Sequence, residues 1–93
     1  MVRKEKIGLA LFLRAKPVKM LISLRSRPKY ATILSKEADC TYSHTVKILD
    51  VFNELKLVEF EKRGRIKIVK LTDTGESVAR LLEALVSKLS KLG

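Results

Sequence analysis

Three cations surround a single glycine in the stretch EFEKRGRIKIVKLT, residues 59–72: Lys62, Arg63 and Arg65. Lysine and arginine are common ligands of phosphate groups, lysine as a point charge and arginine through paired N–H donors. One acid, Glu61, lies beside them. Exposed hairpin turns are often charged for solubility alone, but this excess of like charge favours a contact with a polyanion.

Side chains suited to catalysis are scarce. Cys40 and His44 are spaced as a possible pair of metal ligands, but two ligands are too few for a protein zinc site, and the chain has no other Cys or His. The sequence contains no Gly-rich phosphate loop and no Ser/His/Asp set. We therefore predict no enzymatic activity, no metal site and no cofactor. A lone cysteine cannot form an internal disulfide, which favours a cytoplasmic protein.

The composition favours one small domain with a polyanionic partner. The 93 residues, 46% of them hydrophobic, suffice for a single domain spanning 1–93. Twenty Lys and Arg against ten Asp and Glu leave a net charge of +10, which suits nucleic acid or an anionic membrane surface. The longest uncharged apolar run, residues 7–13, is too short to span a bilayer. The absence of Gln, with a single Asn, resembles a thermophile composition.

Three helices are predicted in the first half of the chain, at residues 17–25, 30–39 and 42–55. Pro17 and Pro28 bound the first two, because proline is tolerated near a helix start and disfavours helix in the residue before it. Thr41 is the expected N-cap of the third helix. A helical wheel separates that helix into a core face and an outer face. The core face holds Thr45, Ile48, Leu49, Phe52 and Leu55, and the outer face holds Ser43, Val46, Lys47, Asp50 and Glu54.

The basic stretch is predicted to be a β-hairpin. A three-residue loop at residues 62–64 pairs Phe60 with Ile66 and Val58 with Ile68, so that apolar residues share a face. This loop also puts Gly64 at the position that requires a left-handed residue. The charged tip would then project from the domain.

Residues 41–76 resemble the recognition-helix and wing segment of MarR-like winged-helix regulators, especially small archaeal ones. Their pattern contains a Leu-x-x-x-Gly-Leu-Val/Ile helix exit, a Gly-Arg wing tip and a Leu-Thr-x-x-Gly start of the last helix. Lys56 departs from this pattern, because the family usually has glycine there. The resemblance implies an α+β, mainly α, winged helix-turn-helix with a two-stranded wing and a long C-terminal helix. The matching residues are Phe52, Leu57, Val58, Gly64, Arg65, Leu71, Thr72 and Gly75.

The resemblance also implies that residues 42–47 enter a DNA major groove while the wing reaches an adjacent minor groove or phosphates. A second basic segment, at the junction of the first two helices, could contact the sugar–phosphate backbone or could be a solvated surface. The predicted DNA-binding residues are Tyr42, Ser43, His44 and Lys47 of the helix, Lys62, Arg63 and Arg65 of the wing, and Arg25, Arg27 and Lys29 of the junction.

The last helix is predicted at residues 73–92 and has apolar residues at heptad spacing. This stripe is wider than one small domain needs, which favours a homodimer built from this helix and the N-terminal segment 4–15. The segment's composition favours helix, although its continuous apolar run would also suit a strand. The predicted dimerisation residues are Val78, Leu82, Leu85, Leu89 and Leu92.

Together these features predict a homodimeric, sequence-specific transcription regulator that binds double-stranded DNA, with no membrane contact and no evident small-molecule ligand. Two other functions fit the same residues. One is an architectural protein that coats DNA with little sequence preference, and the other is a winged-helix module that binds a protein or RNA. The ratio of specific to non-specific affinity separates the first two, and weak duplex binding would indicate the third.

Overall fold

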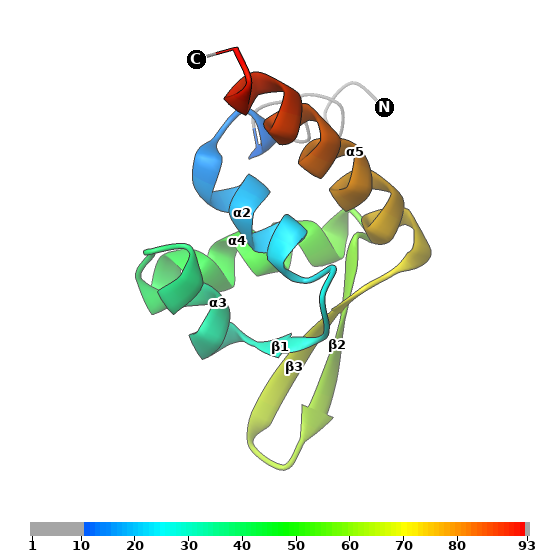
Figure 1. The fold of residues 1–93 in the computed structure, drawn as a ribbon. Helices are drawn as coiled ribbons and strands as arrows, with labels where there is room; N and C mark the ends of the chain where they lie inside the picture. The colour runs from blue at the N-terminus through cyan, green and yellow to red at the C-terminus, as the bar shows by residue number, and fades with distance from the viewer. Residues whose placement is uncertain (1–10, 93) are drawn as a thin grey trace.

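The computed structural model describes residues 11–92, in which a group of helices covers one end and a β-hairpin projects from the other (Figure 1). The mainly helical α+β winged-helix architecture predicted from the sequence is confirmed. In chain order the elements are α2 (Ala15–Ser23), β1 (Lys29–Tyr30), α3 (Ala31–Glu37), α4 (Tyr42–Glu54), β2 (Val58–Arg63), β3 (Ile66–Leu71) and α5 (Asp73–Ser90).

The first two helices lie close to their predicted positions, with shifted ends. Helix α2 begins two residues before Pro17, which is tolerated because the first N–H groups of a helix have no intrahelical acceptor. Helix α3 is shorter than predicted, because Tyr30 pairs with a strand and Asp39 has a left-handed φ of 52°. Of the N-terminal segment 4–15, residues 4–10 lie outside the described range. Leu11 and Phe12 are helical, and the Phe12 ring stacks on Phe52 with centroids 5.8 Å apart.

Helix α4 begins at the predicted residue and ends one residue before the predicted Leu55. The Thr41 hydroxyl accepts a hydrogen bond from the His44 N–H at 3.2 Å, which confirms the N-cap. Of the predicted core face, Thr45, Ile48, Leu49 and Phe52 are buried, whereas Leu55 is half-buried. The helix exit keeps its expected geometry although Lys56 replaces glycine: Lys56 has a φ of 62°, and the Leu57 N–H donates to the Phe52 carbonyl at 2.9 Å.

The two-stranded hairpin predicted as the wing is present, as β2 and β3, and β1 adds a third strand that was not predicted, in the order β1-β3-β2. Strand β1 contains two residues, of which Lys29 pairs with Val69 and Tyr30 with Ile68. So short a strand has no periodicity of its own, and it exists because β3 offers a free edge next to the start of α3.

The predicted hairpin register was wrong. The turn has two residues, Gly64 and Arg65, so Phe60 lies opposite Val69 and not Ile66. Gly64 still takes the left-handed conformation, with a φ of 64°, at the first turn position, where a hairpin with a two-residue loop commonly has glycine. The prediction failed because β3 is apolar on both faces: Val69 is fully buried, whereas Ile66 is 50% exposed.

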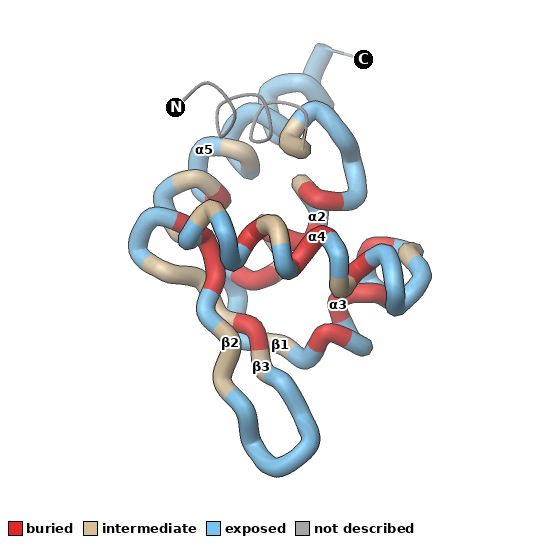
Figure 2. The backbone as a smooth tube through the Cα atoms, turned by 180° about the vertical axis from the view of Figure 1, so that it is seen from behind, coloured by how far each residue is buried: buried red, intermediate tan, exposed pale blue. Residues whose placement is uncertain are grey.

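The core lies where α2, α3, α4 and the start of α5 meet the base of the hairpin (Figure 2). The hairpin tip and the second half of α5 lie outside it and are exposed. Helix α5 ends two residues before the predicted Leu92. Its first turn is fixed by Thr72, whose hydroxyl accepts the Gly75 N–H at 3.0 Å and donates to the Lys56 carbonyl at 2.7 Å. These bonds join the exit of α4 to the start of α5 and fix the angle at which the hairpin leaves the domain.

Candidate nucleic-acid interface

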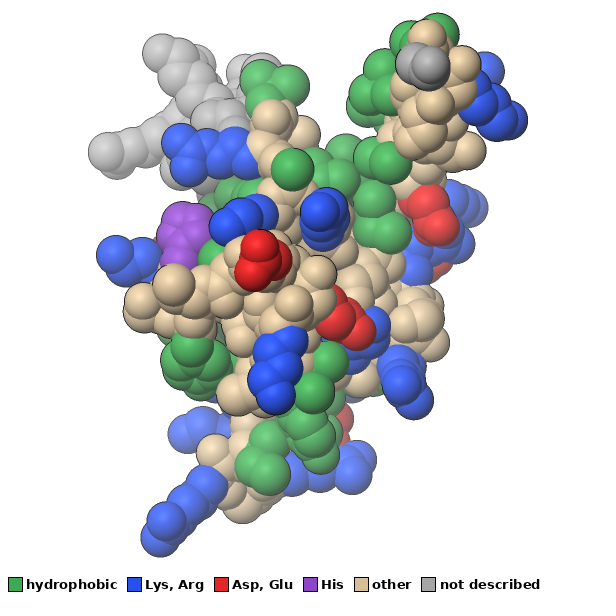
Figure 3. Space-filling model, turned by 60° about the vertical axis from the view of Figure 1, so that its left-hand side comes forward, with side chains coloured by type: hydrophobic (Ala, Val, Ile, Leu, Met, Phe, Trp, Pro, Cys, Tyr) green, Lys and Arg blue, Asp and Glu red, His purple; other side chains and the backbone are tan. Residues whose placement is uncertain are grey.

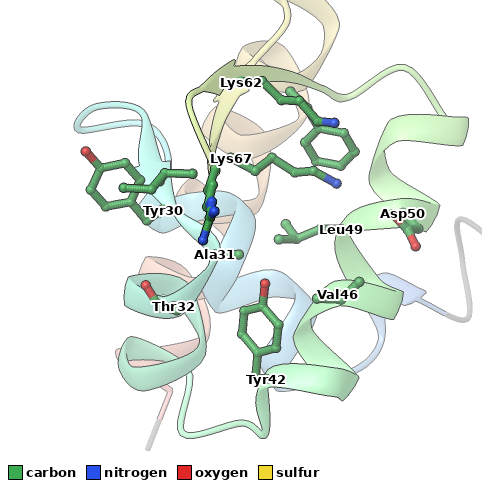
Figure 4. A pocket seen from close by; sticks show the side chains of 12 residues that line it. Tyr30, Ala31, Thr32, Tyr42, Val46, Leu49, Asp50, Lys62 and Lys67 are labelled. Atoms are coloured by element: carbon green, nitrogen blue, oxygen red, sulfur yellow. The ribbon is translucent and has the colours of Figure 1, made fainter.

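A groove of about 390 Å³ lies between α4 and the hairpin, which we call the wing (β2, β3 and the turn between them). Val46 and Leu49 line it from α4, and Phe60, Lys62 and Lys67 line it from the wing (Figure 4). The groove therefore has an apolar floor and cations on the wing side. Its other lining residues are Tyr30, Ala31, Thr32, Tyr42, Asp50, Arg65 and Ile66.

The predicted contact residues of α4 are all accessible. Tyr42 is 55% exposed, and Ser43, His44 and Lys47 are exposed as well. The first turn of the helix has no acidic side chain, so its positive dipole end is not neutralised there. This end of α4 is chemically suited to a negatively charged partner.

The predicted wing residues lie at the exposed tip, and Lys and Arg side chains spread over this part of the surface in Figure 3. Arg65 is part of the turn, and the Arg63 Nε donates to Glu61 Oε2 at 3.1 Å. Lys62 lies directly opposite Lys67. Lys67 was missed by the sequence prediction, because the assumed register placed it on the other face.

The junction cations differ from those of the wing, because two of them already pair with carboxylates. Arg25 bonds Glu83, and its Nε lies 3.0 Å from Glu76 Oε1. The hydrogen bonds that the guanidinium donates to Glu83 and Glu76 raise the pKa of Arg25 above its ordinary value.

Lys29 makes a similar pair on the other side of the junction. Its Nζ lies 2.9 Å from Glu37 Oε1. The pKa of Glu37 is lowered by a hydrogen bond from the Ser23 hydroxyl and, second, by the bond from Lys29. Arg27 is exposed and lines a separate depression beside β1. The three junction cations therefore do not form one continuous free cluster.

Cys40 is half-buried and His44 exposed, and among residues 11–92 no three Cys, His, Asp or Glu side chains gather as metal ligands would. Within the same range, no helix has the length and apolar character needed to cross a membrane.

The predicted dimerisation stripe divides into two parts. Val78 and Leu82 pack against the chain's own core. Leu85, Leu89 and Leu92 are exposed, as are Leu81 and Val86. Hydrophobic side chains mark the end of α5, which stands away from the neighbouring surface in Figure 3. The second half of α5 therefore has an apolar surface with no partner among the described residues.

Comparison with known proteins gives one sequence relative and several solved structures of the same fold. An uncharacterized protein from Archaeoglobus fulgidus is 31% identical over 85 residues, covering 88% of this chain and 90% of that protein. The crystal structure of AF1382 from Archaeoglobus fulgidus matches with a TM-score of 0.75 and 25% identity, over 80% of this chain and 87% of that one. No protein-family model matches the chain.

A third match is the MarR family transcriptional regulator SPO1453 from Silicibacter pomeroyi, with a TM-score of 0.75 and 25% identity. It covers 84% of this chain, which spans only 57% of that regulator. The arrangement of α4, wing and α5 defines a winged-helix protein. The chain belongs to the MarR-like winged-helix family and has an archaeal homologue.

Proposed function

We propose that the protein is a sequence-specific transcription regulator that binds duplex DNA as a homodimer. The observation that carries this proposal is the shared groove: the accessible end of α4 and the cationic wing flank one depression, and both carry positive charge. This arrangement suits a duplex that is contacted in two adjacent grooves. The transcriptional regulator SPO1453, which has the same fold, supports the same function.

The two parts of the surface have different roles in this proposal. The N-terminal end of α4 enters the major groove, where Ser43, His44 and Lys47 reach base edges or phosphates and Tyr42 lies against the backbone. Arg63 and Arg65 of the wing reach the minor groove or its phosphates. The exposed leucines of α5 join two copies, so the preferred site has two half-sites related by a two-fold axis.

The junction residues contribute unequally. Arg27 is exposed and stays a predicted backbone contact. Arg25 and Lys29 are paired with carboxylates, so their primary role is to hold the elements of the domain together.

The test is binding of a fluorescein-labelled random-sequence duplex across a salt series, followed by anisotropy. Arg63→Ala with Arg65→Ala should weaken binding and make the slope of log K against log salt shallower, by about 0.9 for each lost phosphate contact. The control is Arg80→Ala with Lys88→Ala, which removes the same charge from α5, a helix that does not line the groove (Figure 1).

Equal slopes for the two double variants would remove the wing from the mechanism. Absence of wild-type binding at low salt would reject duplex DNA and favour a protein or RNA partner. Selection of a preferred duplex from a random pool then separates a specific regulator from an architectural protein, because only the regulator enriches one sequence over the pool.

A further inference from the structure

Two lysines face each other across the wing. The register of β2 and β3 places Lys62 directly opposite Lys67, so their ammonium groups project from the same face of the hairpin. Like charges in opposite positions of an antiparallel pair are destabilising. Neither lysine has an ion-pair partner among residues 11–92, whereas Arg63 and Lys70 on the other face pair with Glu61 and Glu59. The uncompensated pair lies on the face that lines the groove.

Phe60 fixes the position of the Lys67 side chain. The Lys67 Nζ lies 4.4 Å from the centroid of the Phe60 ring, within the range of a cation–π contact. Phe60 is half-buried at the base of the wing. Figure 4 shows the Lys62 and Lys67 side chains extending from the wing toward the α4 side of the groove. Lys67 is therefore held near the floor of the groove and away from the tip.

The floor beneath the two lysines is apolar. Val46 and Leu49 of α4 and Phe60 of the wing line it, and Asp50 is the single acid among the lining residues. No ion pair joins Asp50 to either lysine within the described range. Apolar side chains under a pair of cations suit a strand of alternating deoxyribose and phosphate.

The geometry of a duplex requires such a strand at this place. The major groove and the adjacent minor groove are separated by one sugar–phosphate backbone. If the end of α4 occupies the first groove and the wing tip the second, as the proposed function requires, that backbone must cross the depression between them. The lysine pair faces this depression.

We infer that Lys67 is a further DNA-binding residue, and that with Lys62 it binds the phosphates of the strand that crosses the groove between α4 and the wing. Phe60 is a positioning residue, because it holds the Lys67 ammonium in the groove. The inference rests on the proposed function. Lysine contacts to phosphate carry no base information, so this pair adds affinity for every duplex sequence.

The test compares Lys67→Gln with Lys70→Gln, each of which removes one positive charge from β3. Lys70 projects from the opposite face and pairs with Glu59 at 3.9 Å, so it serves as the matched control. The salt slope for a random duplex should become shallower by about 0.9 in Lys67→Gln. If the variant and the wild type bind equally at 1 M salt, this change makes the variant bind roughly eightfold more weakly at 0.1 M salt. Lys70→Gln should leave the slope unchanged, and Lys67→Arg should restore it.

Phe60→Leu tests the positioning role, since it keeps an apolar side chain but removes the aromatic face. It should weaken duplex binding in the wild-type background and have little further effect in Lys67→Gln, with circular dichroism confirming the fold. If the wild type binds tightly but Lys67→Gln and Lys70→Gln have the same salt slope, the role of Lys67 is overturned and the proposed function is not. A wild type that binds no duplex at low salt would overturn both this inference and the proposed function.

Discussion

At the scale of single residues, the glycine in the Leu-Thr-x-x-Gly motif has a steric explanation. A Cβ atom on Gly75 would lie 1.9 Å from the Leu57 carbonyl oxygen, which is backbone and cannot rotate away. The same carbonyl accepts the Thr72 N–H at 3.0 Å. The start of α5 thus packs directly on the exit of α4, and only glycine permits this approach.

Gly75→Ala should therefore destabilise the protein by about 3 kcal/mol, the upper part of the usual range for overpacking, because the two backbone segments must separate. The matched control is Gly64→Ala. Gly64 has open space around its Cβ position, so the cost there is the left-handed φ of 64°, about 1 kcal/mol. Urea denaturation of both variants gives the comparison, and equal losses of stability would refute the steric explanation.

At the scale of secondary-structure elements, the sequence predicted the helices better than the sheet. Helix α4 was found from its N-cap and its 3.6-residue periodicity, both of which are local features. The register of β2 against β3 depends on which apolar face of β3 meets the core, and Ile66 and Val69 gave conflicting indications. The register decides on which face of the hairpin Lys67 lies, so the wrong register also concealed Lys67 as a candidate contact residue. Strand β1 depends wholly on a non-local edge and had no local signal.

Arg25 connects two elements, because its side chain joins the turn after α2 to helix α5. Its guanidinium bonds both Glu76 and Glu83, although the three side chains are partly exposed. Sequence alone could not separate this role from a phosphate contact, since the carboxylates lie 51 and 58 positions away along the chain.

Arg25→Ala should lower the melting temperature at low salt, and the difference from wild type should narrow at high salt as screening weakens the ion pairs. Arg80→Ala is the control, since Arg80 lies on α5, the helix that carries Glu76 and Glu83, and has no ion pair within residues 11–92. The slope of duplex binding against salt should not change in Arg25→Ala. A slope shallower by about 0.9 would instead place Arg25 among the phosphate contacts.

At the scale of the whole molecule, the proposed DNA contacts and the exposed leucines lie at opposite ends. The wing and the end of α4 carry cations, whereas the second half of α5 carries the exposed leucines at the far end of the chain's fold (Figure 1). A dimer formed through α5 would leave both wings free to contact DNA. The cations of the wing end would oppose association of two copies there, whereas burial of the exposed leucines would favour association through α5.

The dimer predicts a specific sensitivity to charge on one face of α5. Leu85 and Leu89 are 53% and 54% exposed, so Leu85→Glu with Leu89→Glu should leave the protomer folded while placing acids in the proposed interface. Sedimentation equilibrium at micromolar protein should give about twice 10.5 kDa for the wild type and 10.5 kDa for the variant. Ser87→Glu, which adds an acid on the other side of the helix, should remain dimeric. A wild type that sediments at 10.5 kDa, or a Ser87→Glu variant that dissociates as readily as the double variant, would exclude a dimer built on this leucine face.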